Sequence, residues 1–189
     1  MRALRTAILP VLLAGCLPHP GAQPERFYVL QPAPGRVHYT GPPVAVAETM
    51  AAGFYDTVQI VYSDSPGTRS RYRYSFWTEP PQAALQAELA SRLESRREDG
   101  AAAGARWLLR TELRELYHDA VKPPGTVRIS LAARLESLPD HALVAQRRFS
   151  RAAPAPSFDG AGAAAATRAA AAGVLDDIVA WVQMQADRT

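Results

Sequence analysis

Hydrophobic and polar residues alternate one by one along two stretches in the second half of the chain. In residues 106–116 the odd-numbered positions carry uncharged, mostly apolar side chains: Trp107, Leu109, Thr111 and Leu113. The even-numbered positions 110, 112 and 114 are charged: Arg110, Glu112 and Arg114. Residues 126–137 continue the pattern, and a turn at 139–141 leads into a third predicted strand over 142–149. A period of two with one polar side predicts antiparallel strands with one face on a core and the other in water. Short turns between the three strands predict a meander.

Shorter strand patterns occupy the first half of the chain, and proline or glycine bounds them. They cover residues 27–30, 43–47 and 58–62. In the fourth, residues 69–77, three arginines share one parity and three aromatic residues the other: Arg69, Arg71 and Arg73 against Tyr72, Tyr74 and Phe76. This alternation predicts a half-buried strand. The turn residues at 63–67 predict that it forms a hairpin with 58–62.

Two segments show helical periodicity instead. Leu85, Leu89 and Leu93 recur every four residues and predict an amphipathic helix over 82–97, with Thr78 as its cap. A loop over 152–156 then leads to a second helix over 160–185, alanine-rich at first and apolar-striped later. The predicted fold class is α+β: an antiparallel, or alternatively mixed, sheet with two helices packed on one face.

The start of the chain has the pattern of a secretory signal. Arg2 and Arg5 precede a short apolar run, which ends in small residues at 14 and 15. The run is far shorter than the roughly 20 apolar residues that a membrane-spanning helix needs. We therefore expect a lipoprotein signal peptide over 1–15, a lipidated, proline-rich tether over 16–26, and a single domain over 27–189.

Cys16, the only cysteine, follows this signal directly. A small buried residue is one interpretation, but residues 13–16 read Leu-Ala-Gly-Cys and resemble the bacterial lipobox. That resemblance implies cleavage before Cys16, lipid on its sulfur, and acylation, for example with palmitate, of the new amino terminus. In the Gram-negative sorting pattern, Leu17 in place of aspartate favours the outer membrane.

Composition restricts the function of the remaining chain. Removing residues 1–15 from the 189 leaves 174, enough for one domain with a core. The whole chain carries a net charge of +3, and two of its arginines lie in the signal, so the mature chain is nearly neutral at +1. Such a balance argues against nucleic acid as a partner, since nucleic-acid binding needs a strong positive field.

The sequence predicts no enzyme, cofactor or metal site. It contains no phosphate-binding loop, nucleophile motif, or His and Cys at metal-ligand spacing. Asp176 and Asp177 form an adjacent acidic pair, which we expect to be a solvated helix face. Tyr72, Tyr74 and Trp77 are candidate contacts for a partner, because tyrosine and tryptophan are favoured at interfaces. The alternative is that these aromatic residues are core.

The order of these elements resembles a known family. The quoted strands, the Trp77–Thr78–Glu79–Pro80–Pro81 segment before the leucine-striped helix, the meander and the last helix resemble the ABC-type transport auxiliary lipoproteins, the PqiC-like family. The resemblance implies a periplasmic lipoprotein of the outer membrane that is an accessory to an MCE-type phospholipid transport system. It implies docking to an MCE-domain protein and allows a homo-oligomer. Two alternatives are an assembly lipoprotein of the pilotin type and a periplasmic lipid-binding carrier.

Overall fold

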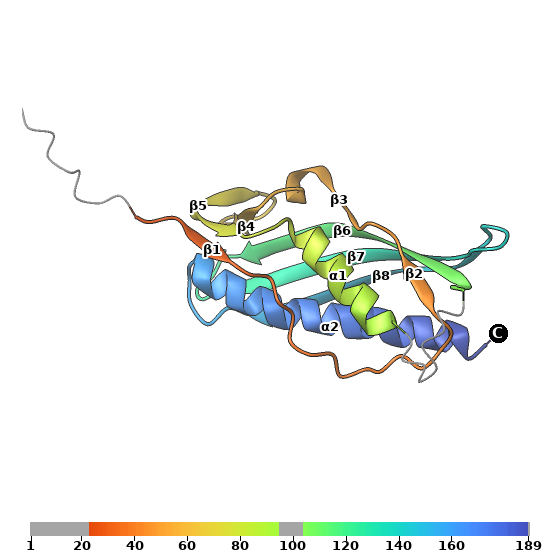
Figure 1. Ribbon diagram of the computed structural model, residues 1–189. Helices are drawn as coiled ribbons and strands as arrows, with labels where there is room; N and C mark the ends of the chain where they lie inside the picture. The colour runs from red at the N-terminus through yellow and green to blue at the C-terminus, as the bar shows by residue number, and fades with distance from the viewer. Residues whose placement is uncertain (1–22, 95–103, 189) are drawn as a thin grey trace, which may run out of the picture.

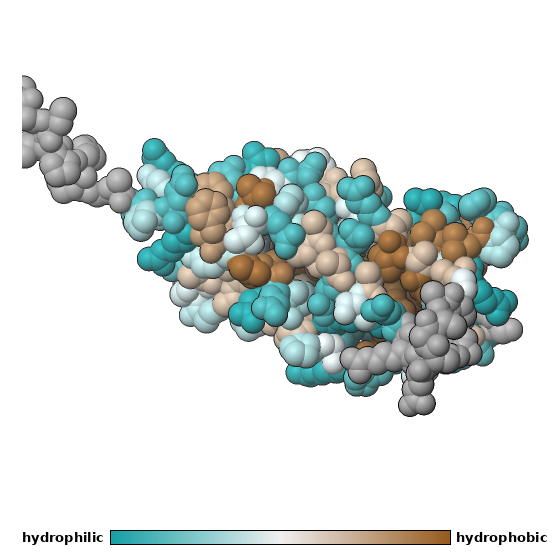
Figure 2. All heavy atoms as spheres, viewed as in Figure 1, coloured by the Kyte–Doolittle hydropathy of each residue, from teal (hydrophilic) through white to brown (hydrophobic). Residues whose placement is uncertain are grey.

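A computed structural model describes residues 23–94 and 104–188 of the chain. One sheet forms one layer and two helices form the other (Figure 1). The helices are α1 (Pro81–Leu93) and α2 (Gly160–Ala186), and a short 3-10 helix, η1, spans Gly53–Tyr55. The strands are β1 (Arg26–Tyr28), β2 (Val44–Val46), β3 (Met50–Ala51), β4 (Gln59–Ser63), β5 (Ser70–Trp77), β6 (Trp107–Asp119), β7 (Thr126–Ser137) and β8 (Leu143–Pro154). On the face that Figure 2 shows, polar side chains are widespread and hydrophobic side chains gather over β2.

The sheet is mixed, and β6 is the strand to which most of the others attach. The main order is β1-β5-β4-β6-β7-β8, and β2 and β3 also pair with β6. Parallel pairing joins β2, β3 and β4 to β6, whereas β4–β5, β6–β7 and β7–β8 are antiparallel. The predicted hairpin, the predicted meander and the α+β class are therefore confirmed.

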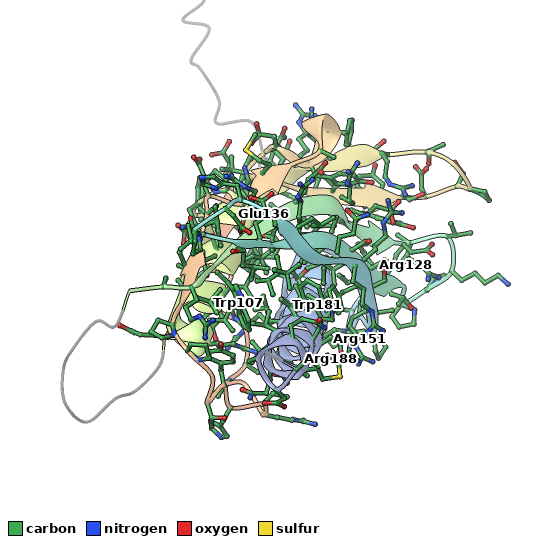
Figure 3. The ribbon with its side chains drawn as sticks, turned by 90° about the vertical axis from the view of Figure 1, so that its right-hand side faces the viewer. Trp107, Arg128, Glu136, Arg151, Trp181 and Arg188 are labelled. Atoms are coloured by element: carbon green, nitrogen blue, oxygen red, sulfur yellow. The ribbon has the colours of Figure 1, made fainter. Side chains whose placement is uncertain are left out.

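The core lies between the sheet and the two helices. On β6 the predicted inner residues Leu109 and Leu113 are fully buried, and the leucine stripe of α1 is too. The alanines in the first half of α2 let its backbone approach the sheet, and larger residues such as Trp181 fill the space further along. Trp107 and Trp181 both lie in this layer, whereas Glu136 lies on the opposite face of the sheet (Figure 3).

Three predicted boundaries are wrong. The loop predicted over 152–156 begins only at 155, because β8 continues to Pro154 and pairs there with Thr126. Thr78 does not cap α1: its backbone N–H donates to the Tyr28 carbonyl 3.0 Å away, and Pro80 is the N-cap residue without a side-chain cap. A proline at the first helical position, Pro81, is tolerated there because that residue has no intrahelical donor to lose. The helix ends at Leu93 rather than at 97.

An irregularity in β5 also changes which aromatic residue is buried. Gln59 of β4 pairs with Phe76, but Val61, two residues later, already pairs with Arg71. The extra residues of β5 form a bulge, and a bulge reverses the direction of the side chains that follow it. Consequently Phe76 does not share the buried side of Tyr72 as predicted, and stacks on exposed Phe27 with ring centroids 5.3 Å apart. Trp77 is the residue that enters the core.

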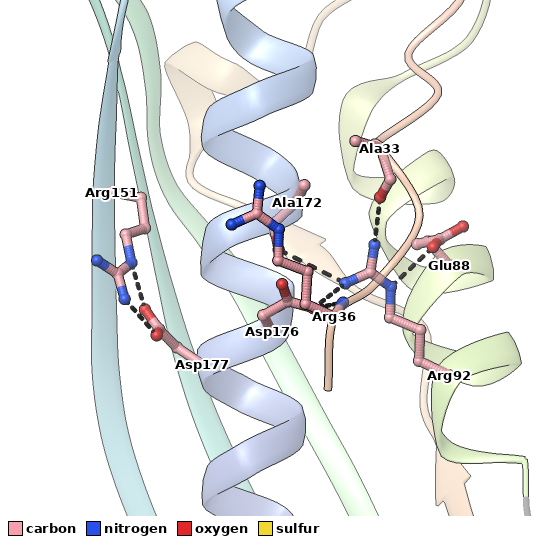
Figure 4. Close-up of polar contacts among 8 residues, drawn as sticks. All are labelled: Ala33, Arg36, Glu88, Arg92, Arg151, Ala172, Asp176 and Asp177. Atoms are coloured by element: carbon pink, nitrogen blue, oxygen red, sulfur yellow. Dashed lines mark hydrogen bonds and ion pairs between the residues drawn. The ribbon is translucent and has the colours of Figure 1, made fainter. Parts of the chain in front are cut away.

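A cluster around Arg92 joins the two helices and the segment that crosses them (Figure 4). The Arg92 side chain is only 6% exposed and forms ion pairs with Glu88 of α1 at 2.7 Å and Asp176 of α2 at 2.8 Å. It also donates to the Ala33 carbonyl at 2.9 Å, and Asp176 accepts from the Arg36 backbone N–H at 3.1 Å. Three segments far apart in sequence are thus fastened at one point.

The neighbouring Asp177 has a separate partner on the sheet. Arg151 of β8 donates to both of its carboxylate oxygens, at 2.6 and 2.5 Å (Figure 4). The expectation that Asp176 and Asp177 form a solvated pair is therefore wrong for Asp176, which is 17% exposed beside buried Arg92, whereas Asp177 is 30% exposed and pairs with an exposed arginine.

The predicted signal (1–15) and Cys16 lie outside the described residues, and of the predicted tether only 23–26 are described. Within the described ranges, no helix is long and apolar enough to cross a membrane.

Candidate functional site

A groove of about 550 Å³ lies where β5 meets the amino-terminal end of α2. Three segments distant in sequence line it: the start of β1, the middle of β5, and the loop that precedes α2. The lining includes Gln23, Pro24, Arg26, Tyr28, Tyr72, Arg73, Tyr74, Ser75, Phe158 and Asp159. Two of the three aromatic residues predicted as partner contacts, Tyr72 and Tyr74, therefore lie side by side in one concave surface.

Tyr72 forms the floor of the groove and is fixed by its contacts. Its ring packs on Tyr62 with centroids 4.6 Å apart, and its hydroxyl lies 2.8 Å from Nδ1 of His118. Burial, followed by the charge of Asp159 and by Tyr62, raises the pKa of Tyr72 to about 12. The phenol therefore stays protonated at any physiological pH, and its proton is available to His118.

His118 belongs to this contact network, although the sequence does not single it out. It lies near the end of β6, is 1% exposed, and has Nε2 3.0 Å from the Pro124 carbonyl. Burial lowers its pKa from the ordinary value. A neutral imidazole fits both contacts if Nε2–H donates to Pro124 and Nδ1 accepts from Tyr72. His118 shares the parity of buried Leu116, but that parity is the charged one earlier in the strand, and only the register shift between Leu113 and Glu115 turns it inward.

Tyr74 and Trp77 differ in accessibility. Tyr74 is half-buried at the groove, and the Arg73 guanidinium lies 5.2 Å from its ring centroid, within the range of a cation–π contact. Trp77 is 3% exposed and packs in the core with Ile60 and Thr167. The structure thus leaves two of the three predicted contact residues accessible and places the third in the interior.

The positive end of α2 borders the groove but is already satisfied. Asp159 caps the helix, accepting from the Gly162 N–H at 2.8 Å and from the Ser157 hydroxyl at 2.7 Å. These hydrogen bonds hold the pKa of the Asp159 carboxyl below its ordinary range. The Asp159 carboxylate already occupies the positive end of the α2 dipole and its free N–H groups. A ligand in the groove would therefore meet tyrosine and arginine side chains and not an uncapped helix terminus.

The outer face of the sheet, opposite the helices, is rich in ion pairs. Glu136 accepts from Arg110 at 3.2 Å and pairs with Arg134 at 2.7 Å, and Asp119 pairs with Arg128 at 3.0 Å. The hydrogen bond from Arg110 lowers the pKa of Glu136. Arg128, labelled in Figure 3, lies on this face. Its charges are matched with one another, as in a stable water-facing surface.

The described residues, 23–94 and 104–188, contain no group of three His, Cys, Asp or Glu side chains arranged to hold a metal ion. The fold and the groove define a class of protein: an α+β domain with a groove lined by aromatic and arginine side chains. A family model described as the ABC-type transport auxiliary lipoprotein component matches residues 28–179. The chain belongs to this family, whose members are auxiliary components of ABC-type transport.

Solved structures show the same fold at low identity. Protein XCC0632 from Xanthomonas campestris is 24% identical, with a TM-score of 0.71 over 86% of this chain and 98% of that chain. Protein CT253 from Chlamydia trachomatis is 10% identical, with a TM-score of 0.50 over 79% of this chain and 100% of that chain. No curated protein matches this chain.

Proposed function

We propose that this protein is a non-enzymatic accessory lipoprotein of an MCE-type ABC phospholipid transport system, anchored at the periplasmic face of the outer membrane. The observation that carries the proposal is the family match over residues 28–179. The Leu-Ala-Gly-Cys motif at 13–16, in a sequence with signal character before it, supports the anchor. Two acyl chains or more hold a protein stably on a membrane, whereas one holds it only marginally.

Docking is the mechanism that this arrangement supports. Cys16 fixes the chain to the bilayer, and the tether determines how far the domain can move from it. The groove beside β5 then receives a protruding segment of the MCE-domain protein. Tyr72 and Tyr74 offer rigid aromatic area, and Arg73 offers a charged hydrogen-bond donor. Tyrosine and arginine are enriched among the few interface residues that contribute most of the binding free energy. Several copies of the domain would multiply the number of such contacts on one partner.

The test is affinity purification of the lipidated protein from its own envelope, followed by mass spectrometry of the recovered partners. We expect an MCE-domain protein together with its ABC components. Recovery of a secretin or of a β-barrel assembly factor in their place would refute the transport proposal and support an assembly role. Phospholipid extracted with the protein, without a protein partner, would indicate a carrier.

A matched pair of variants tests the groove. Tyr74→Ser truncates a groove residue, and Phe54→Ser truncates an aromatic residue of η1 that is 40% exposed and lies outside the groove. We expect Tyr74→Ser to weaken recovery of the MCE-domain protein at least about tenfold, the loss typical of an interface anchor. Phe54→Ser serves as the control and should retain it. Equal recovery with both variants would exclude the groove as the docking surface.

A further inference from the structure

Three segments meet at the end of the domain from which the chain leads toward Cys16: residues 23–26, the turn 120–125 and the loop 155–159. The Ala155 N–H donates to the Gly125 carbonyl at 3.0 Å, and the Phe158 ring lies edge-on to His118, with centroids 6.1 Å apart. Gln23 and Phe158 line the same groove. In Figure 1 this end holds the start of α2, and the C-terminus lies at the opposite end.

Large hydrophobic side chains are exposed at this end without a covering element among the described residues. Val121 at the tip of the turn is 40% exposed, Phe158 in the loop is 52% exposed, and Phe27 at the start of β1 is 61% exposed. They come from three separate segments, so the sequence does not show them together. Apolar side chains at loop tips that share one end are a feature of surfaces that enter a membrane interface.

Positive charge accompanies these apolar tips. Lys122, the only lysine of the chain, follows Val121 in the exposed turn, and Arg26 is exposed at the start of β1. Two of the nearby carboxylates are engaged within the domain: Asp119 pairs with Arg128 at 3.0 Å, and Asp159 caps α2. Glu25 is exposed beside Arg26. Exposed cations next to apolar tips suit the phosphates of a bilayer surface.

The length of chain before the domain brings a membrane within reach. Gln23 lies seven residue steps after Cys16, with six residues between them, and a fully extended chain of seven steps spans at most about 25 Å. This step rests on the proposed lipid anchor at Cys16. Such a tether holds the bilayer at a high effective concentration beside this end of the domain, so weak apolar and ionic contacts are sufficient for binding.

We infer that this end, formed by the turn 120–125 and the loop 155–159, rests on a phospholipid bilayer, with Val121 and Phe158 inserted at the interface and Lys122 on headgroup phosphates. The domain then stands upright on the membrane. The β7–β8 hairpin, whose Leu143 and Val144 are also exposed, projects away from it. Each of the 12 residues of β7 adds about 3.3 Å, so the hairpin tip lies about 40 Å further out.

A lipid-borne quencher distinguishes the two ends. The full lipidated chain is reconstituted into vesicles of phosphatidylethanolamine and phosphatidylglycerol. An environment-sensitive fluorophore is attached to a cysteine introduced as Val121→Cys or, for the control, as Ala142→Cys in the exposed turn of the β7–β8 hairpin. The thiol of Cys16 is occupied by lipid in the anchored protein, so the introduced cysteine is the sole reactive one. Both positions are exposed, and circular dichroism verifies that the fold is retained.

We expect blue-shifted emission and quenching by headgroup spin-labelled phospholipid at position 121, and neither at 142. Adding Lys122→Gln to the labelled Val121→Cys chain should lower the ratio of quenched to unquenched label about fivefold, the effect of one cation near an anionic surface. Equal quenching at both positions, quenching only at 142, or none at either would overturn the inference.

The anchor is measured separately. The unsubstituted chain should float with the vesicles and leave its single cysteine unreactive to maleimide. If it floats but Val121→Cys shows no quenching, the bilayer contact fails and the proposed anchor stands. If it does not float and Cys16 reacts, the anchor fails, and the bilayer contact fails with it.

Discussion

Replacing Arg92 with methionine removes the cation at which α1, α2 and the crossing segment 31–43 meet, while keeping much of the side-chain volume. Arg92 is 6% exposed, and the substitution leaves Asp176, 17% exposed, and Glu88, 29% exposed, without their partner. A hydrogen bond to a charged group contributes about 1.5–3 kcal/mol, and removing one member of a buried pair costs about 3–5 kcal/mol.

Two features reduce the expected loss. Glu88 is exposed enough for water to solvate it again, and Asp176 retains the hydrogen bond from the Arg36 backbone N–H. We therefore expect Arg92→Met to lower the free energy of unfolding by about 3 kcal/mol, the lower limit for a buried pair. For a chain of this length, that corresponds to a decrease in Tm of about 6–12 °C.

Arg151→Met provides the matched control on the neighbouring carboxylate. Arg151 is 52% exposed and Asp177 30% exposed, so water replaces most of what the pair loses, and stability should be nearly unchanged. Urea unfolding monitored by tryptophan fluorescence measures both variants, because all three tryptophans, Trp77, Trp107 and Trp181, are buried.

Equal losses in the two variants would refute the argument that burial decides the effect, and so would a neutral Arg92→Met. A double-mutant cycle with Asp176→Asn adds a second check. If Arg92 acts through Asp176, the second substitution costs far less in the Arg92→Met background than in the unsubstituted chain.

Two further predictions concern the end of the sheet around His118. Because burial lowers the pKa of His118 in the folded state, the unfolded chain binds more protons than the folded one. The contribution of His118 to stability is therefore complete above about pH 6.5 and is lost as pH falls through the folded pKa. His118→Gln should flatten this dependence in urea unfolding between pH 5 and 8, and an unchanged dependence would exclude His118 as its source. Gly125→Ala should destabilise by about 2–3 kcal/mol, since Gly125 has φ +90° and an added Cβ would lie 2.8 Å from the Asp119 carbonyl oxygen. Gly67→Ala, at φ +80° with open space around it, should cost only about 1 kcal/mol; equal thermal shifts for the two glycine variants would contradict the steric argument.

Periodicity was sufficient to predict the elements that are long. The alternation in β6 and β7 and the leucine stripe of α1 are local patterns, and each reflects burial on one side of a regular element. Such patterns do not record irregular pairing. The bulge opposite Gln59 and Val61 reverses the order of side chains in β5, so Trp77 rather than Phe76 enters the core. No residue type within the strand marks this position.

The site depends on contacts between distant segments, which a single sequence does not display. Arg26, Tyr72 and Phe158 meet only because β1 pairs with β5 and the loop before α2 closes over them. The partner of Asp176 is similarly hidden, because Arg92 belongs to another helix. Of the three aromatic residues predicted as partner contacts, Tyr72 and Tyr74 are accessible and stay candidates. Trp77 is buried in the core.

Three of the strands that pair with β6 come before it in the sequence, and this affects the order in which the sheet can form during synthesis. Along one edge it receives β2 at Trp107–Leu109, β3 at Glu112–Leu113 and β4 at His118–Asp119. All three strands precede β6 by at least 40 residues in the sequence, so the ribosome synthesises them first. As the chain emerges amino terminus first, β4 can pair with β5, but β2 and β3 have no strand to join until β6 follows. A fragment ending before Trp107 should therefore leave the segment with β2 and β3 open to proteases.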